Sequence, residues 1–134
     1  MSRQINIAIV DDDEQVRTAL SRLISAFGFI ATAYESAEAF IADPETRRFS
    51  CVLSDYQMPG KSGLDLVDHL RANSIQASVL VITARDHRAI EEKCKRLQVA
   101  LLKKPLEASA LRKAIQDALS SPAASADAIR GSLI

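Results

Sequence analysis

Five side chains that could take part in chemistry stand at or just after the ends of short apolar runs: Asp11, Asp12, Asp55, Thr83 and Lys104. Carboxylates held close together raise one another's pKa unless a divalent cation lies among them. Oxygen ligands without a nearby His or Cys favour Mg²⁺ (or Mn²⁺), which keeps some waters and accepts phosphate oxygens. A cation beside a nucleophilic carboxylate, with a lysine to neutralise phosphoryl charge, is typical of acyl phosphate formation.

The apolar runs predict five strands, at residues 5–10, 29–34, 51–55, 78–83 and 99–102. Residues 5–10 are apolar on both alternating faces, as in a central strand that helices cover on each side. The run at 51–55 ends on Asp55 and then breaks into the turn sequence Met58-Pro59-Gly60. Because ligands bind at the carboxyl ends of parallel strands, we expect the five side chains to share one pocket.

Apolar residues at helical spacing follow each predicted strand. The first helix begins on the acids after residue 10, with Asp13 as its N-cap, and ends at Gly28. Ser36 is the expected N-cap of a short second helix, which Asp43-Pro44 ends. Three more helices are expected at about 64–73, 86–96 and 111–119. The 86–96 segment has few large apolar residues, so we expect that helix to be thinly anchored.

Alternating strands and helices predict a doubly wound α/β fold with a five-stranded parallel sheet and helices on both faces. The chain of 134 residues fits one domain, which we place at 1–120. Residues 121–134 are rich in Ala and Ser and lack an apolar stripe, so we expect a flexible C-terminal tail.

Composition narrows the partners and the compartment. The 17 basic and 17 acidic residues balance, which gives no electrostatic case for direct binding of nucleic acid or a membrane surface. Cys51 and Cys94 are expected to be buried reduced thiols. His69 and His87 are solitary and are expected to have surface or helix-flank roles. With no signal peptide or membrane span expected, we place the protein in the cytoplasm.

Four motifs in this order resemble the signature set of two-component response-regulator receiver domains, whose fold is called CheY-like or flavodoxin-like. They are Val10-Asp11-Asp12-Asp13-Glu14, Ser54-Asp55-x-x-Met58-Pro59-Gly60-x-Ser62-Gly63, Ile82-Thr83-Ala84 and Lys104-Pro105. The resemblance runs from about residue 4 to residue 119. Residues 35–40 (Glu-Ser-Ala-Glu-Ala-Phe) are also similar to receivers of NarL/FixJ-type transcription factors.

This resemblance implies a role for each acid in the pocket. Asp55 would accept a phosphoryl group from a sensor histidine kinase or a phosphotransfer protein. Asp12, Asp55 and the backbone carbonyl of Gln57 would bind Mg²⁺ directly, and Asp11 would act through a water. The protein would catalyse its own phosphotransfer and autodephosphorylation without being an enzyme toward other substrates.

The resemblance also implies a switch. The Thr83 hydroxyl would turn toward the phosphoryl oxygen and Lys104 would form an ion pair with it. The change would reach a downstream protein or a fused output domain through the face of the fourth helix, fifth strand and fifth helix, which could also form a homodimer. Leu101 occupies the switch position where receivers usually carry Tyr or Phe, and Gln98 stands where many carry Gly.

Two alternatives stay open at this stage. One is a receiver-like interaction module that works without phosphorylation, an alternative that Leu101 and the thinly anchored helix keep open. The other is a small phosphatase of the haloacid-dehalogenase type, whose D-x-D-x-[TV] motif would place Gln15 at the Thr/Val position. A further hypothesis is that Arg85 reaches over the pocket and affects partner choice or phosphate lifetime.

Overall fold

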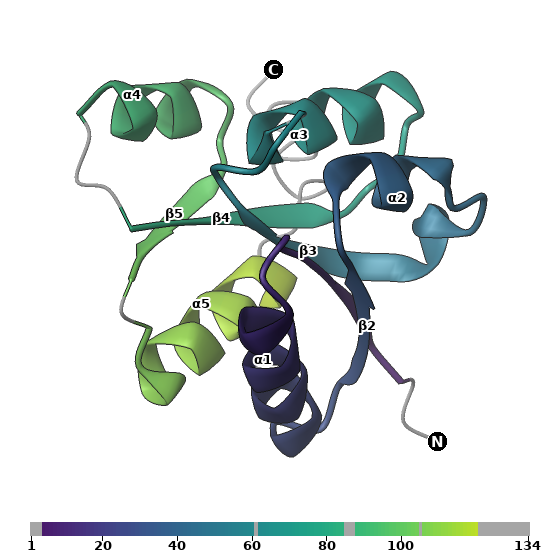
Figure 1. The fold of residues 1–134 in the computed structure, drawn as a ribbon, viewed down its shortest axis with the longest axis vertical. Helices are drawn as coiled ribbons and strands as arrows, with labels where there is room; N and C mark the ends of the chain where they lie inside the picture. The colour runs from purple at the N-terminus through teal and green to yellow at the C-terminus, as the bar shows by residue number, and fades with distance from the viewer. Residues whose placement is uncertain (1–3, 61, 85–87, 105, 121–134) are drawn as a thin grey trace.

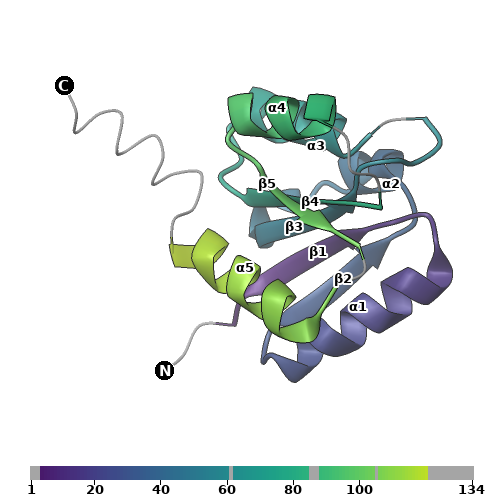
Figure 2. The same cartoon turned by 90° about the vertical axis from the view of Figure 1, so that its left-hand side faces the viewer.

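A computed structural model describes residues 4–60, 62–84, 88–104 and 106–120 of the chain. The strands form one parallel sheet in the order β2-β1-β3-β4-β5 (Figures 1 and 2). Their bounds are β1 Asn6–Val10, β2 Ile30–Tyr34, β3 Phe49–Asp55, β4 Ser78–Thr83 and β5 Ala100–Lys103. The predicted five-stranded parallel sheet is therefore confirmed, with small shifts at strand ends.

Helices cover both faces of the sheet, which confirms the doubly wound α/β fold. One face carries α1 and α5, and the other carries α2, α3 and α4 (Figures 1 and 2). The helices are α1 Glu14–Ala26, α2 Ala37–Ala42, α3 Gly63–Ala72, α4 Arg88–Arg96 and α5 Ala108–Ser120, with a 3₁₀ turn, η1, at Thr46–Arg48. Among the helices of the described residues, none is both long enough and apolar enough to cross a membrane.

Alternation along the strands divides the core into two layers. On β1, Ile7 and Ile9 pack with residues of α1 and α5, whereas Ala8 and Val10 pack with residues of α2, α3 and α4. All four are fully buried, as predicted for a central strand. The strand β3 begins at Phe49, two residues before its predicted start, because the Phe49 ring is buried in the layer under α2 and α3.

Side-chain caps fix the starts of three helices. The Asp13 carboxylate accepts from the backbone N–H of Gln15 at 2.8 Å, and Ser36 Oγ accepts from Ala39 at 3.0 Å. Both predicted N-caps are thus confirmed. At α3, Ser62 and Asp65 form a capping box, which fixes the start of that helix.

Three helices end in the same backbone motif, in which a residue with positive φ turns the chain out of the helix. That residue is Gly28 after α1 (φ 96°), Ser74 after α3 (φ 55°) and Gln98 after α4 (φ 58°). Gln98 thus stands at a position that favours glycine, as the resemblance implied.

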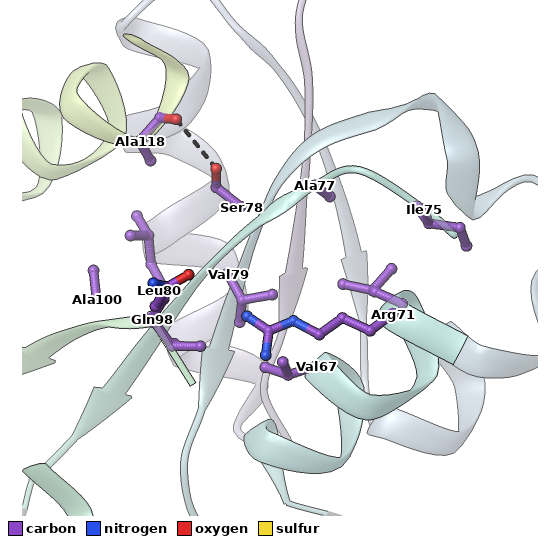
Figure 3. A pocket seen from close by; sticks show the side chains of 12 residues that line it. Val67, Arg71, Ile75, Ala77, Ser78, Val79, Leu80, Gln98, Ala100 and Ala118 are labelled. Atoms are coloured by element: carbon purple, nitrogen blue, oxygen red, sulfur yellow. Dashed lines mark hydrogen bonds between the residues drawn. The ribbon is translucent and has the colours of Figure 1, made fainter. Parts of the chain in front are cut away.

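Arginines bind the helix ends that lack glycine. Arg47 donates to the Asn73 carbonyl at 2.8 Å, and Arg71 donates to the Leu97 carbonyl. Arg71 also lies along a cavity of about 130 Å³ at the amino ends of β4 and β5, whose lining includes Val79 (Figure 3). These contacts satisfy carbonyls that a helix end leaves without an intrahelical partner.

Some predictions fall on residues outside the described ranges. They are the flexible tail at 121–134, the hypothesis on Arg85, and residues 86 and 87 at the start of the predicted fourth helix. The helix itself is confirmed at Arg88–Arg96, and of its side chains only Ile90 and Cys94 are buried, as expected for thin anchorage.

Candidate functional site

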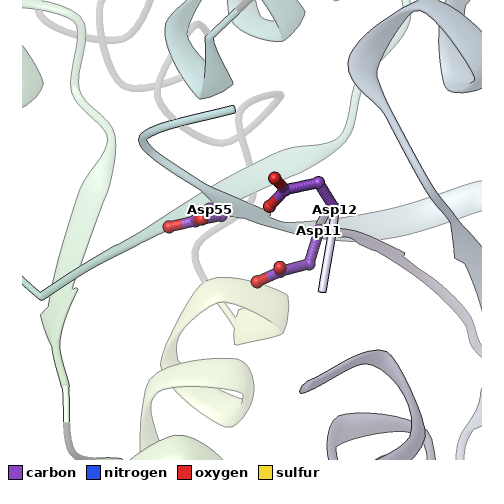
Figure 4. Close-up of side chains that lie close together, drawn as sticks. All are labelled: Asp11, Asp12 and Asp55. Carbon is purple, nitrogen blue, oxygen red and sulfur yellow. The ribbon is translucent and has the colours of Figure 1, made fainter. Parts of the chain in front are cut away.

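The sheet brings three of the predicted carboxylates together at the carboxyl ends of neighbouring strands (Figure 4). Val10 is paired with Ser54 in the register of β1 and β3, so the residues that follow each of them emerge side by side. Asp11, Asp12 and Asp55 each offer an oxygen, and these oxygens lie within 4.8 Å of one another. A cluster this tight is a strongly negative site.

Asp11 is the most deeply buried of the three carboxylates, with 2% of its surface exposed. Its Oδ1 accepts from the backbone N–H of Asp13 at 2.9 Å, whereas its Oδ2 is buried without a hydrogen-bond partner among the described residues. Burial raises the pKa of Asp11 above its ordinary value. A buried carboxylate oxygen without a partner is unfavourable on its own, so this atom points to a positively charged ligand.

Asp55 is the last residue of β3 and lies close to the other two acids and to Lys104. Burial, followed by the nearby charge of Asp11, raises the pKa of Asp55 to about 6, while Lys104 acts in the opposite direction. Lys104 Nζ lies 3.9 Å from Asp55 Oδ1. The Lys104 backbone N–H donates to the Thr83 carbonyl at 2.8 Å, which fixes where the lysine leaves β5.

Thr83 and Leu101 lie on the two strands beyond Asp55. Thr83 ends β4, is 2% exposed, and follows Ile82, the register partner of Asp55. Leu101 is paired with Val81 and packs, half-buried, on the core layer under α2, α3 and α4. The structure therefore places Thr83 at the edge of the acidic site and Leu101 further back along β5.

Two consecutive lysines at the end of β5 contact different parts of the molecule. Lys103 forms an ion pair with Glu91 of α4 at 2.8 Å, whereas Lys104 approaches Asp55. Gln57 lies in the exposed loop after β3, and its backbone forms a hydrogen bond that lowers the pKa of Asp55.

The donor set fits a hard divalent cation. It consists of carboxylate oxygens, which are the ligands that Mg²⁺ and Mn²⁺ prefer, and it includes the Asp11 oxygen that has no other partner. A cation there would also reduce the repulsion among the three acids.

Two residues that support the site were not identified as such from the sequence. The Arg17 guanidinium donates to the Asp11 carbonyl at 2.8 Å, which ties α1 to the acidic turn. A Cβ on Gly63 would lie 2.9 Å from the Asp55 carbonyl oxygen, so α3 can begin this close to β3 only with glycine. Gly63 belonged to a recognised motif, but its role depends on a contact that only the fold creates.

The other singled-out residues have structural surroundings. The His69 ring packs edge-on against Phe40. Burial raises the pKa of the Cys51 thiol to about 12, which keeps it protonated, and Cys94 is also buried. Gln15, which stands at the Thr/Val position of the phosphatase motif, is exposed in the first turn of α1.

A doubly wound parallel sheet with an acidic pocket and a lysine at its carboxyl edge defines the receiver class of α/β domains. The response regulator receiver domain model matches residues 7–116, most of the chain. The chain therefore belongs to the response regulator receiver domain family, which confirms the resemblance seen in its motifs.

Individual relatives agree with this assignment. The chain is 30% identical to the transcriptional regulatory protein FixJ of Bradyrhizobium diazoefficiens over 96% of its own length and 64% of that protein. It is also 30% identical to a cyclic di-GMP phosphodiesterase of Thermotoga maritima, over 86% of the chain and 31% of that protein. A crystal structure of FixJ-N superposes with a TM-score of 0.80 at 29% identity, covering 89% of this chain and 96% of that one. The chain thus spans less than two thirds of these longer relatives.

Proposed function

We propose that Asp55 is the phosphoacceptor of this receiver. The observation that carries the proposal is its position: Asp55 lies within 4.8 Å, oxygen to oxygen, of Asp11 and Asp12, and 3.9 Å from the Lys104 ammonium. Asp55 thus lies close to both the other acids and the cationic side chain of the pocket. That arrangement suits a group that must first be a nucleophile and then carry a phosphoryl group.

The proposed reaction starts from a phosphohistidine on a sensor histidine kinase or a phosphotransfer protein. An Asp55 carboxylate oxygen attacks phosphorus, the phosphorus–nitrogen bond breaks, and the histidine ring takes the electron pair of that bond. Lys104 then forms an ion pair with the phosphoryl oxygens, and the Thr83 hydroxyl donates to one of them. Water later attacks phosphorus, the bond from Asp55 to phosphorus breaks, and inorganic phosphate leaves, which restores the Asp55 carboxylate. The protein thus acts on its own phosphoryl group and on no metabolic substrate.

The proposed cofactor is Mg²⁺ (or Mn²⁺). Asp12, Asp55 and the Gln57 carbonyl would bind it directly, and Asp11 would bind through a water. When bound, the cation supplies positive charge that offsets the carboxylates while phosphoryl charge arrives. The buried Asp11 oxygen without a partner supports this assignment.

The partners follow from the class of protein. Besides the kinase, we propose a downstream protein or a fused output domain that reads the face of α4, β5 and α5, with a homodimer on that face as one form of readout. The longer FixJ and phosphodiesterase relatives support a fused output. The balanced charge favours output through protein contacts, without direct contact to nucleic acid or membrane. The proposed compartment is the cytoplasm.

Mass spectrometry after incubation with acetyl phosphate and Mg²⁺ tests this proposal. We expect a gain of one phosphoryl group on the parent, no gain on Asp55→Asn, and no gain when a chelator removes the cation. Asp68→Asn, which removes an exposed carboxylate on α3, serves as the matched control and should be modified like the parent.

Three results would contradict the proposal. A parent that takes no phosphoryl group would favour the interaction module that works without phosphorylation, for which Leu101 in the aromatic position is the specific observation. A gain that persists in Asp55→Asn would place the phosphoacceptor elsewhere. A gain without any divalent cation would remove the role assigned to Asp11 and Asp12.

A further inference from the structure

The ion pair between Lys103 and Glu91 links the candidate site to α4. Lys103 Nζ lies 2.8 Å from a Glu91 carboxylate oxygen, and both side chains are about half exposed. Lys103 is the register partner of Thr83 and the residue immediately before Lys104. Lys103 therefore lies next to Thr83 and Lys104, the two residues expected to contact the phosphoryl group. It also forms an ion pair with a residue of α4.

Among the described residues, α4 has few other anchors. Ile90 and Cys94 are its buried side chains, and Arg71 binds the Leu97 carbonyl at the far end of the helix. Figure 2 shows α4 lying along the β5 side of the sheet. Leu101 packs beneath this layer without a polar group, so it lacks the hydroxyl that a tyrosine in the same place would offer.

We propose that the Lys103–Glu91 pair is a latch that holds α4 on β5 while Asp55 is unphosphorylated and that couples α4 to the site. This inference rests on the proposed phosphorylation of Asp55. Lys103 and Lys104 are consecutive and bind different partners, so movement of Lys104 toward a phosphoryl group shifts the Lys103 backbone relative to Glu91. Lys103 does not contact the phosphoryl group itself. It is a positioning residue that transmits movement of Lys104 and Thr83 to α4.

The strength of such a pair suits a reversible switch. An exposed ion pair changes an equilibrium by a factor of about two to five and weakens as salt rises. A latch of that size biases the position of α4 without preventing phosphorylation from overcoming it. The expected effects are therefore small, and a charge cycle is needed to assign them to the pair.

Hydrogen exchange of the α4 amides in the full, unphosphorylated chain provides the first test. Glu91→Gln, Lys103→Gln and the double variant should each exchange about two to five times faster than the parent, by the same factor. The exchanged pair, Glu91→Lys with Lys103→Glu, should restore the parent rate. In about 1 M salt the parent should approach the single variants, which loss of packing alone would not produce.

The rate of phosphorylation by acetyl phosphate and Mg²⁺ provides the second test. Breaking the pair releases α4 from its unphosphorylated position, so the single and double variants should react about two to five times faster than the parent, and the exchanged pair like the parent. Glu92→Gln removes the same charge one residue further along α4 and should change neither measurement.

The two tests fail in different ways. Effects that add in the double variant, or exchange that equals the parent's in both single variants, would overturn the latch. Faster exchange with unchanged phosphorylation would overturn the coupling. A parent that takes no phosphoryl group would overturn the proposed function and the coupling with it, whereas hydrogen exchange would still decide whether the pair holds α4.

Discussion

Polar groups have opposite surroundings at the two ends of the sheet, where the strands have their carboxyl ends (the carboxyl edge) and their amino ends (the amino edge). At the carboxyl edge, three carboxylates crowd together and a buried oxygen of Asp11 has no partner among the described residues. At the amino edge, Arg47 and Arg71 bind helix-end carbonyls, and the chain turns out of α3 and α4 with its backbone hydrogen bonds in place. The comparison indicates that the amino edge stabilises the fold while the carboxyl edge is unfavourable until a ligand with positive charge binds.

The largest effect is expected from removing the charge of Lys104 at the carboxyl edge. Lys104→Gln removes the charge that lies 3.9 Å from Asp55, so the rate of phosphorylation by acetyl phosphate should fall about a hundredfold. Lys113→Gln, which removes an exposed charge on α5, should react like the parent. A fall of less than about threefold would mean that Lys104 does not neutralise the incoming phosphoryl group.

The next effect is on the free energy of unfolding. Most substitutions of buried residues lower it, whereas Asp55→Asn should raise it. The pKa of Asp55 in the folded protein is raised to about 6 from an ordinary 3.8. The stability linked to its protonated form is therefore complete below about pH 4 and is lost as the pH rises through about 6. In chelator, Asp55→Asn should be more stable than the parent by roughly 2 kcal/mol at pH 7 and no more stable near pH 4.

Chemical denaturation across this pH range measures that difference. Asp68→Asn controls for the loss of one carboxylate. A stability gain that is the same at both pH values would show that charge repulsion at the site is not its cause, and adding Mg²⁺ should reduce the advantage of Asp55→Asn because the cation stabilises only the parent's full site.

The smallest effect sharpens the other side of the comparison. Gln98 turns the chain out of α4 with φ 58°, a conformation in which a residue with a Cβ is strained. Gln98→Gly should therefore raise the free energy of unfolding by about 1 kcal/mol, and Gly28→Ala should lower it by a similar amount. Nothing lies within 4 Å of a Cβ placed on Gly28, so that control reports on the backbone alone. Equal stability of the parent and Gln98→Gly would indicate that the Gln98 side chain offsets the strain.

The sequence predicted most of what depends on local pattern. The N-caps Asp13 and Ser36 and the central position of β1 follow from residue type and spacing, and the structure agrees. The meeting of Asp11, Asp12 and Asp55 also followed, because parallel strands must deliver their carboxyl ends to one edge. The roles of these residues, and the binding of a cation, remain predictions.

Contacts between distant segments could not be predicted in this way. Neither the positive φ of Ser74 nor the Arg47 contact beside it has a signal in the neighbouring sequence. The pairing of Lys103 with Glu91 depends on how α4 lies over β5, which is set by packing of the whole layer. The early start of β3 has the same cause, since Phe49 becomes a strand residue only when its ring is buried.

Gly63 has a consequence for how the region beside Asp55 can diversify. The loop after β3 is closed at its base, because the Tyr56 N–H donates to the Ile82 carbonyl at 2.7 Å and Gly63 packs on the Asp55 carbonyl. Both ends of the loop are thus fixed to the strands independently of the exposed Gln57 and Pro59 side chains between them. Duplicated copies of such a domain can acquire new loop surfaces, and hence new partners, while the Asp55 carboxylate stays in place.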